Sequence, residues 1–318
     1  MSKKVKKVLL IVALLIAVLA AAAMIAGPSF MGSQILAAST ELVPREQTLK
    51  NVQNCWEMEQ FDVEAFQAKY QIQEAIATQM GEDEHNLPFD VITKEGNKNI
   101  VVMAHGLGGT RQTNYFPAQI FLENGCNVIT YDQRNSGGNT ADCNTFGCLE
   151  KFDLIYCIRY ARANFPDAKI FVWGESMGGA TALLAVAHED VQKDVTALIL
   201  DCPLSSMNDM MEIVMGEMNI PIPMDKLIAW GSAATEKKLG FTYADAEGTA
   251  AAEKITIPTL VINSRVDEMT PYFMGVDVYE HLASEKKELF TSETSKHIEI
   301  KYDDPEGYEQ KIVEFLSL

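Results

Sequence analysis

Residues 168–187 decide the fold, and their sequence is AKIFVWGESMGGATALLAVA. Ala168–Trp173 is an almost continuous apolar run, which is typical of a strand buried on both faces of a sheet. Small residues dominate Gly178–Ala187, where we expect a helix. Between them, Gly174 and Gly178 flank Ser176, as a sharp turn that exposes a serine hydroxyl requires. The stretch therefore predicts a strand–turn–helix unit with Ser176 as a nucleophile.

The same rhythm of strands and helices extends from residue 99 to the C-terminus. Further apolar runs predict strands at residues 99–104, 126–131, 196–200, 259–262 and 287–290, and helical spacing predicts helices at 115–123, 149–164 and 306–316. Before them, residues 51–79 suggest one or two helices and residues 87–93 an edge strand. Alternating strands and helices predict an α/β fold whose mostly parallel sheet carries helices on both faces.

The rhythm breaks between residues 203 and 249, where methionines cluster around Ile220–Pro223 and Trp230. We interpret this stretch as a small helical cap inserted into the sheet domain. A methionine-rich surface adapts to irregular apolar partners, but ordinary packing of cap helices explains the composition equally well. The predicted organisation is an anchor at residues 1–27, a linker and N-terminal helices at 28–80, and the α/β domain at 81–318.

The N-terminus carries Lys3, Lys4, Lys6 and Lys7, followed by the uncharged residues 8–27. A helix of that length spans roughly 30 Å, the thickness of a bilayer core. The positive flank predicts a single-pass transmembrane helix in the cell membrane, with its N-terminus in the cytoplasm and the catalytic domain extracellular. The alternative is a secreted protein after signal cleavage, although secretory apolar regions usually run only about 7–15 residues.

Charge and cysteine content limit the classes of partner. The chain has 44 acidic and 26 basic residues, a net charge of −18, which argues against nucleic-acid binding. Six cysteines show no zinc-site spacing. No metal or organic cofactor is expected, because a serine nucleophile and its base supply the chemistry themselves. Cys143 and Cys148 could close a short disulfide loop in an exported domain, and free thiols are the equal alternative.

Five motifs resemble the α/β-hydrolase superfamily, in particular its serine-aminopeptidase-like and monoglyceride-lipase-like branch. They are His105–Thr110, Tyr131–Gly137, Gly174–Gly178, Val266–Pro271 and Ser295–His297, and the likeness covers roughly residues 99–316. It implies an α/β-hydrolase fold and an oxyanion hole built from the backbone amides of Leu107 and Met177. The loop after residue 131 departs from the family pattern, which usually has glycine and histidine there. We expect Asp132 and Arg134 in that loop to buttress the site.

A serine needs a base, and the chain offers five histidines. His85 precedes the sheet, and His188 lies about 18 Å along the helix from Ser176. His281 falls inside a predicted helix, and His105 stands at a strand end, where a structural role in the loop is expected. His297 follows the last predicted strand, as the chain order Ser–Asp–His requires, so we assign it as the base.

The acid that orients His297 should follow the preceding strand. Asp267 lies in the loop after strand 259–262, where the family resemblance places this acid. Asp201, directly after strand 196–200, is the rival, because some hydrolases take their acid from that strand. We assign Asp267, which completes a predicted triad of Ser176, Asp267 and His297.

These assignments predict a serine hydrolase that cleaves a carboxylic ester through an acyl-enzyme. The substrate is expected to be a small-molecule ester, a lipid or a peptide. A lipase or thioesterase acting on acyl chains is one alternative. A peptidase or amidase is another, and it would need a carboxylate such as Asp209, Glu212 or Glu217 to hold the substrate amine. A different class is a non-catalytic surface protein that uses the fold for binding.

Overall fold

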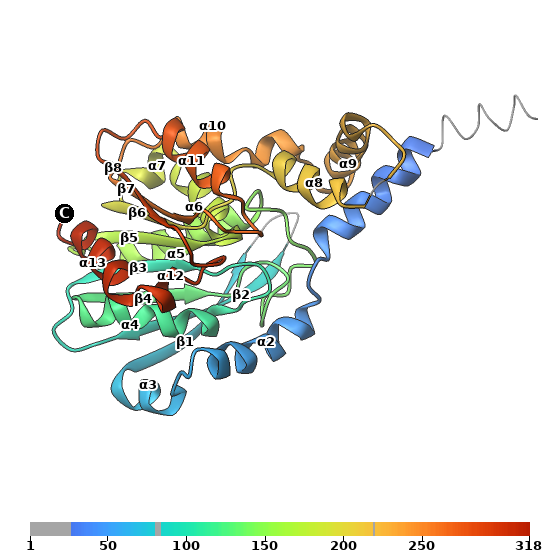
Figure 1. Cartoon of the computed structure of the whole chain (residues 1–318). Coiled ribbons are helices and arrows are strands. Elements are labelled where there is room, and N and C mark those ends of the chain that lie inside the picture. The colour runs from blue at the N-terminus through green and yellow to red at the C-terminus, as the bar shows by residue number, and fades with distance from the viewer. Residues whose placement is uncertain (1–26, 80–83, 219) are drawn as a thin grey trace, which may run out of the picture. The chain divides into compact units, whose positions relative to one another are not determined.

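The computed structural model describes residues 27–79, 84–218 and 220–318 (Figure 1). The chain divides into two compact units. Of the described residues, one unit comprises 27–40, 211–218 and 220–243, and the other comprises 41–79, 84–210 and 244–318. None of the described helices is long and apolar enough to cross a membrane. The transmembrane helix predicted at residues 8–27 lies, apart from Gly27, outside the described residues.

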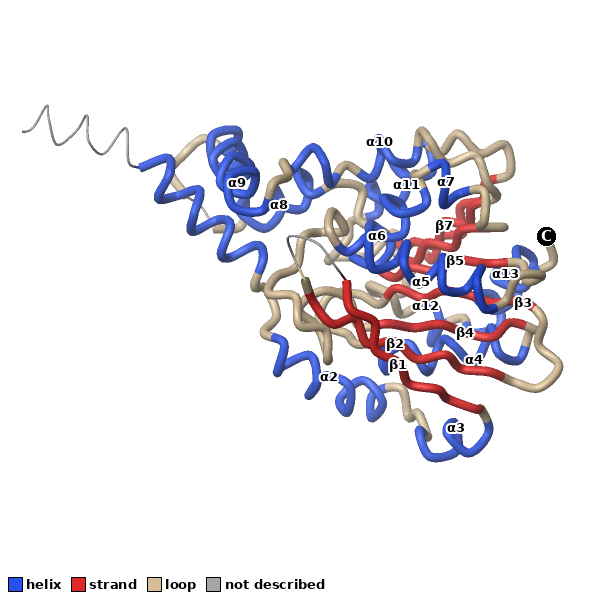
Figure 2. The backbone as a smooth tube through the Cα atoms, turned by 180° about the vertical axis from the view of Figure 1, so that it is seen from behind, coloured by secondary structure: helices blue, strands red, loops and turns tan. Residues whose placement is uncertain are grey.

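The larger unit is built on one eight-stranded sheet with the order β1-β2-β4-β3-β5-β6-β7-β8 (Figure 2). The strands are β1 (Gln71–Gln79), β2 (His85–Thr93), β3 (Asn99–Ala104), β4 (Cys126–Tyr131), β5 (Ile170–Glu175), β6 (Ala197–Asp201), β7 (Thr259–Ser264) and β8 (Lys287–Ser292). All neighbours from β4 to β8 pair in parallel, whereas β1, β2 and β4 pair antiparallel. The predicted mostly parallel sheet is confirmed.

Two hydrophobic cores lie on the two faces of this sheet, because alternate strand residues point to opposite sides. Ile100 and Val102 of β3 belong to one core, while Val101 and Met103 belong to the other. The first core also contains residues of α5 (Glu150–Asn164), α6 (Met177–Val186), α10 (Gly248–Ala252) and α11 (Tyr272–His281). The second contains residues of α3 (Val63–Lys69), α4 (Tyr115–Glu123), α12 (Ile300–Asp303) and α13 (Pro305–Leu316). Helices therefore cover both faces, as predicted.

The N-terminal edge of the sheet differs from the prediction. Gln71–Gln79 forms strand β1, not a helix, and β2 is an inner strand because it pairs with both β1 and β4. Ile72 and Ile76 are four residues apart, a spacing that places side chains on one face of a helix or of a strand alike. Nine residue pairs with β2 fix this segment as a strand. Before this strand lie two helices, α2 (Arg45–Met58) and α3. Residues 51–79 are helical only where these two helices cover them.

The smaller unit consists of helices in its described part. It contains a helix over residues 27–40, the end of α8 (Met207–Gly216) and α9 (Met224–Leu239). A Cβ atom on Gly32 would lie 2.3 Å from the carbonyl oxygen of Trp230, and one on Gly231 would lie 2.8 Å from Ile35 Cγ2. The helix at 27–40 therefore packs closely on α9, so the stretch predicted as a linker and N-terminal helices (residues 28–80) begins with a helix.

Candidate active site

Ser176 stands between the end of β5 and the start of α6, and its backbone is strained. Its φ of 55° and ψ of −118° are rare for a residue other than glycine. A Cβ atom on Gly174 would lie 2.4 Å from the carbonyl oxygen of Gly178. One on Gly178 would lie 2.1 Å from that of Ala104. Only glycine fits at these two positions, so the structure confirms the sharp turn that the sequence predicts.

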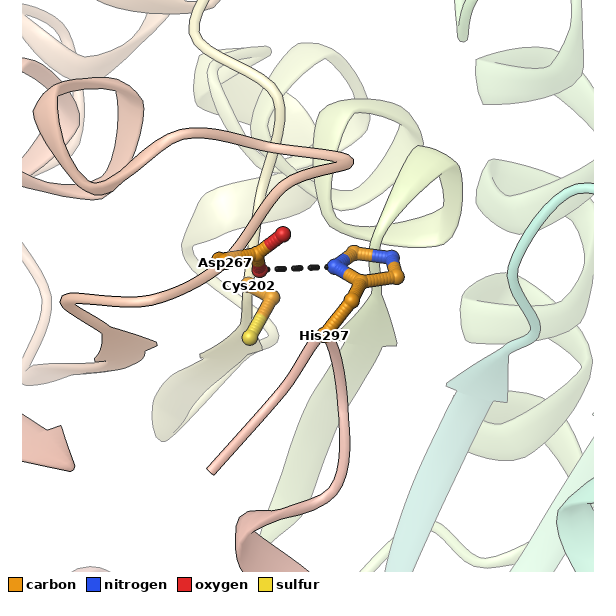
Figure 3. A group of neighbouring side chains, drawn as sticks. All are labelled: Cys202, Asp267 and His297. Carbon is orange, nitrogen blue, oxygen red and sulfur yellow. Dashed lines mark hydrogen bonds and ion pairs between the residues drawn. The ribbon is translucent and has the colours of Figure 1, made fainter. Parts of the chain in front are cut away.

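The structure brings Ser176, His297 and Asp267 together. His297 Nε2 lies 3.0 Å from Ser176 Oγ, and its Nδ1 lies 2.7 Å from Asp267 Oδ2. Figure 3 shows the second of these contacts as a dashed line. Asp267 follows β7 and His297 follows β8, and the carboxyl ends of parallel strands meet at one sheet edge. The three residues predicted for the triad therefore form one hydrogen-bonded chain from carboxylate to hydroxyl.

Asp267 is buried and accepts several hydrogen bonds. Its Oδ1 accepts the backbone N–H groups of Met269 and Thr270, each at 2.8 Å. Burial raises the pKa of Asp267, but the hydrogen bond and charge of His297, together with these amides, lower it below its ordinary value on balance. The carboxylate stays ionised and accepts the proton on His297 Nδ1. His297 Nε2 is thereby left to accept the proton of Ser176.

The two predicted oxyanion amides lie beside Ser176. Leu107 and Met177 line the same pocket as the serine, and a Cβ atom on Gly106 would lie 3.4 Å from Ser176 Cβ. Met177 is the first residue of α6, where backbone N–H groups lack partners within the helix. Among the described residues, no acceptor within the chain takes the N–H of Leu107 or Met177. Both donors are free to bind an oxygen in the pocket.

His105 fixes the peptide that carries the Leu107 amide. Its Nδ1 donates to the carbonyl oxygen of Gly106 at 2.7 Å, and its Nε2 accepts the backbone N–H of Gln133 at 3.0 Å. Complete burial lowers the pKa of His105, so the imidazole is neutral and has one donor and one acceptor nitrogen. Because the Gly106 carbonyl is held in this way, the N–H of the same peptide points in the opposite direction. The structural role predicted for His105 is confirmed.

The rival acid and the other histidines lie elsewhere. Asp201 accepts a hydrogen bond from the Tyr308 hydroxyl at 2.7 Å, and burial raises its pKa to about 6. His85 pairs with Asp153 at 3.0 Å, and His281 Nδ1 donates to the carbonyl oxygen of Asp277. His297 is the histidine that bonds to Ser176, and Asp267 is the acid that bonds to His297.

The loop after residue 131, which departs from the family pattern, is held in place by buried polar contacts. Asp132 is buried, forms an ion pair with Arg111 at 2.7 Å and accepts the N–H of Gly138 at 2.8 Å. Arg134 is also buried and donates to the carbonyl oxygen of Cys143. Both residues therefore buttress the loop, as expected. Cys143 and Cys148 are not joined by a disulfide in the structure.

A buried ion pair next to the serine escaped the sequence analysis. Lys301 Nζ donates to the carboxylate of Glu175, and both side chains are buried. Glu175 directly precedes Ser176, and Lys301 lies in α12, four residues after His297. Burial lowers the pKa of Lys301, but the charges of Glu175 and Asp201 raise it above its ordinary value on balance. The pair joins the nucleophile turn to the segment that carries the base.

Cys202, Asp267 and His297 are the one group of potential metal ligands found among the described residues (Figure 3). Their ligand atoms lie within 4.8 Å of one another. However, His297 Nδ1 already binds Asp267, and burial raises the pKa of the Cys202 thiol well above its ordinary value. A metal needs a thiolate and a free imidazole nitrogen, so these residues do not fit a metal site.

An apolar pocket of about 380 Å³ opens at Ser176. Most of its lining side chains are apolar: Leu42, Val43, Leu107, Phe146, Met177, Leu204, Met210, Met269 and Ile298. Among the described residues that line it, Glu175 is the only acidic one, and this carboxylate is bound to Lys301. The pocket can therefore accommodate an uncharged, apolar group beside the serine.

Comparisons with known proteins indicate the same fold. Residues 99–226 match the family described as the alpha/beta hydrolase fold. The chain is 25% identical over 221 residues to the protein YqkD of Bacillus subtilis (strain 168), covering 69% of this chain and 71% of that protein. It is 22% identical over 186 residues to the lysophosphatidylserine lipase ABHD12 of Rattus norvegicus, covering 58% of this chain and 45% of the lipase.

Among solved structures, the Pyrococcus furiosus esterase Pf2001 is similar to this chain, with a TM-score of 0.63 and 21% sequence identity. The match covers 80% of this chain and 93% of the esterase. The chain therefore has an α/β-hydrolase fold, and its residues 99–226 match the alpha/beta hydrolase family.

Proposed function

We propose that this protein is a serine esterase, with Ser176 as nucleophile, His297 as general base and acid, and Asp267 as the acid that orients His297. The observation that carries the proposal is the hydrogen-bonded chain from Asp267 to Ser176, at 2.7 Å and 3.0 Å, at the mouth of the apolar pocket. The similar proteins Pf2001, an esterase, and ABHD12, a lysophosphatidylserine lipase, support the same class of reaction.

The reaction has two halves. Ser176 Oγ attacks the ester carbonyl carbon while His297 Nε2 takes the hydroxyl proton, and the amides of Leu107 and Met177 bind the carbonyl oxygen as it becomes negative. The C–O bond to the alcohol breaks, the alcohol leaves with the proton from His297, and the acyl group stays on Ser176. Water then attacks the acyl carbon and gives a proton to His297. His297 returns it to Ser176 Oγ as the carboxylic acid leaves.

The composition of the pocket favours esters of apolar acids over amino-acid amides. A peptidase that binds a substrate amine needs an unpaired carboxylate near the serine. Among the described lining residues only Glu175 is acidic, and Lys301 neutralises it. Asp209, one of the three residues considered for that role, accepts a hydrogen bond from Ser205 at 3.0 Å and does not line the pocket. Thioesters and lipids with apolar acyl chains fit the same pocket.

Residues 8–27 are proposed to anchor the protein as a single-pass helix in the cell membrane, with the hydrolase domain outside. The support is the length of the uncharged segment and its four preceding lysines. Fractionation of cells without detergent tests the proposal. Full-length protein in the membrane fraction supports an anchor, and a shortened soluble product supports signal cleavage.

Labelling with a fluorophosphonate tests the esterase proposal, because this reagent forms a covalent bond with an activated serine. Wild-type protein should be labelled and should hydrolyse p-nitrophenyl esters, whereas Ser176→Ala should do neither. Ser317→Ala changes an exposed serine far along the sequence and serves as the matched control, which should behave like wild type. Equal labelling of wild type and Ser176→Ala, or none in wild type, would refute the assignment.

A further inference from the structure

Residues 41–58, here called the N-terminal arm, precede the first strand of the sheet and include α2. They lie outside the region matched by the family and were predicted as part of a linker and N-terminal helices. In the structure, four arm residues line the pocket at Ser176: Leu42, Val43, Asn51 and Cys55. The arm is therefore a wall of the candidate active site.

Several polar contacts fasten the arm to the loops around the site. Asn51 Nδ2 donates to the carbonyl oxygen of Gly108 at 2.9 Å, which ties α2 to the oxyanion loop. The backbone N–H of Gly137 donates to Thr48 Oγ1 at 2.9 Å. Trp56 Nε1 donates to the carbonyl oxygen of Gln112 at 3.2 Å, and the Trp56 ring stacks on Tyr115. These bonds span the arm, so its position relative to the pocket is defined.

Val43 lies directly against the oxyanion loop. A Cβ atom on Gly108 would be 3.6 Å from Val43 Cγ2, which is ordinary van der Waals contact. Gly108 has a φ of 82°, a conformation that favours glycine, so the loop has no side chain of its own at this point. Val43 and its neighbour Leu42, which is 43% exposed, therefore supply the apolar surface on this side of the pocket.

We propose that Leu42 and Val43 determine the acyl-chain specificity of the enzyme, because they form the arm's part of the wall that an apolar acyl chain contacts. The inference rests on the proposed esterase function and deepens it. Each methylene that moves from water into an apolar pocket contributes about fourfold in binding. A substitution in the arm that exposes or buries two or more methylenes of the acyl chain should therefore change the selectivity between long and short esters more than tenfold.

The test is the ratio of kcat/KM for p-nitrophenyl dodecanoate to that for p-nitrophenyl acetate. Val43→Trp places a large ring in the pocket, and we expect the ratio to fall about tenfold or more relative to wild type. Val43→Ala shortens the side chain and so enlarges the pocket. We expect the preferred acyl chain to become longer and the ratio to rise. This variant also keeps the test valid if the tryptophan variant folds poorly. Circular dichroism reports the folding of both variants.

Leu49→Ala is the matched control, because Leu49 lies on α2, is 55% exposed and does not line the pocket. Its ratio should equal that of wild type. Suppose that both Val43 variants still hydrolyse esters and are labelled at Ser176, yet show the same ratio as wild type. That result would overturn the proposed role of the arm and leave the esterase proposal standing. Absence of ester hydrolysis and of labelling in wild type would overturn the esterase proposal and, with it, this one.

Discussion

The two loops that meet at Ser176 are held by different forces. On the oxyanion side, neutral hydrogen bonds from His105 to Gly106 and Gln133 orient the peptide of Leu107. On the base side, ionised groups hold the segment of His297: the Asp267 carboxylate accepts a hydrogen bond from His297, and Lys301 pairs with Glu175. A buried charge that loses its partner is costly, whereas the loss of a neutral hydrogen bond costs less. The base side should therefore respond more strongly to mutation.

The largest effect is expected from Asp267→Asn. The amide keeps the shape of the side chain but stabilises the wrong tautomer of His297 and cannot stabilise the imidazolium, so kcat should fall about 10⁴-fold. Steady-state kinetics with a p-nitrophenyl ester measure the change. Asp201→Asn is the control, because Asp201 bonds to Tyr308 and not to His297. A greater loss of kcat in Asp201→Asn than in Asp267→Asn would make Asp201 the catalytic acid.

Lys301→Met tests the buried pair on the base side. The substitution leaves the Glu175 carboxylate buried without a partner, and the free energy of unfolding should fall by about 3–5 kcal/mol. A double variant, Glu175→Met with Lys301→Met, removes both charges and should recover most of that loss. Chemical denaturation measures both. Lys311→Met, which breaks the pairs of Lys311 with Glu288 and Glu314 near the surface, should cost only about 0–1 kcal/mol. Equal losses for Lys301→Met and Lys311→Met would contradict the distinction between the two kinds of pair.

His105→Leu tests the neutral side. Without the bond from Nδ1, the Gly106–Leu107 peptide loses one of its two restraints, since the N–H of Gly109 still donates to the Gly106 carbonyl oxygen. Loss of a whole oxyanion donor costs about 10²–10³ in kcat, so a partial loss of orientation should cost about 10²-fold or less. KM should change little, because the oxyanion forms only during reaction. A variant that folds and retains wild-type kcat would show that His105 does not position the amide.

Asp201→Asn should change how stability depends on pH. Burial raises the pKa of Asp201 to about 6 from an ordinary value near 3.8, so between these values the folded protein holds a proton that the unfolded chain has released. Stability from this group is therefore present at low pH and is lost as pH rises to about 6. The loss is about 3 kcal/mol at about 1.4 kcal/mol per pH unit.

Unfolding titrations of wild type and Asp201→Asn at several pH values measure this contribution, since the other acids are common to both proteins. The difference should grow in favour of the variant from pH 4 to pH 7. A difference that does not change with pH would refute the raised pKa of Asp201.

Local sequence patterns predicted the elements whose conformation is set by residues close by in the sequence. The strand, turn and helix around Ser176 follow from apolar runs and two glycines, and the order of Ser176, Asp267 and His297 follows from the strands that precede them. The segment Gln71–Gln79 could not be assigned in this way, because Ile72 and Ile76 suit a helix and a strand equally. Its pairing with β2 decides the outcome, and pairing is a contact between strands.

Long-range contacts account for the rest of what the sequence did not reveal. Glu175 and Lys301 are separated by 126 positions, and nothing near either residue marks it as buried. The arm residues Leu42 and Val43 stand in a polar stretch with the pattern of a linker, and only the docking of α2 on Gly108 and Gln112 brings them to Ser176. Such sites emerge from tertiary structure rather than from a motif.

The central claim is that Ser176 carries the acyl group during turnover. Wild-type enzyme that is turning over a p-nitrophenyl ester can be quenched rapidly with acid, digested and mapped by mass spectrometry. The account predicts one acylated peptide, the one that contains Ser176, with the added mass of the acyl group. An acyl group on any other residue, or ester hydrolysis that leaves no adduct on Ser176 at any quench time, would contradict it.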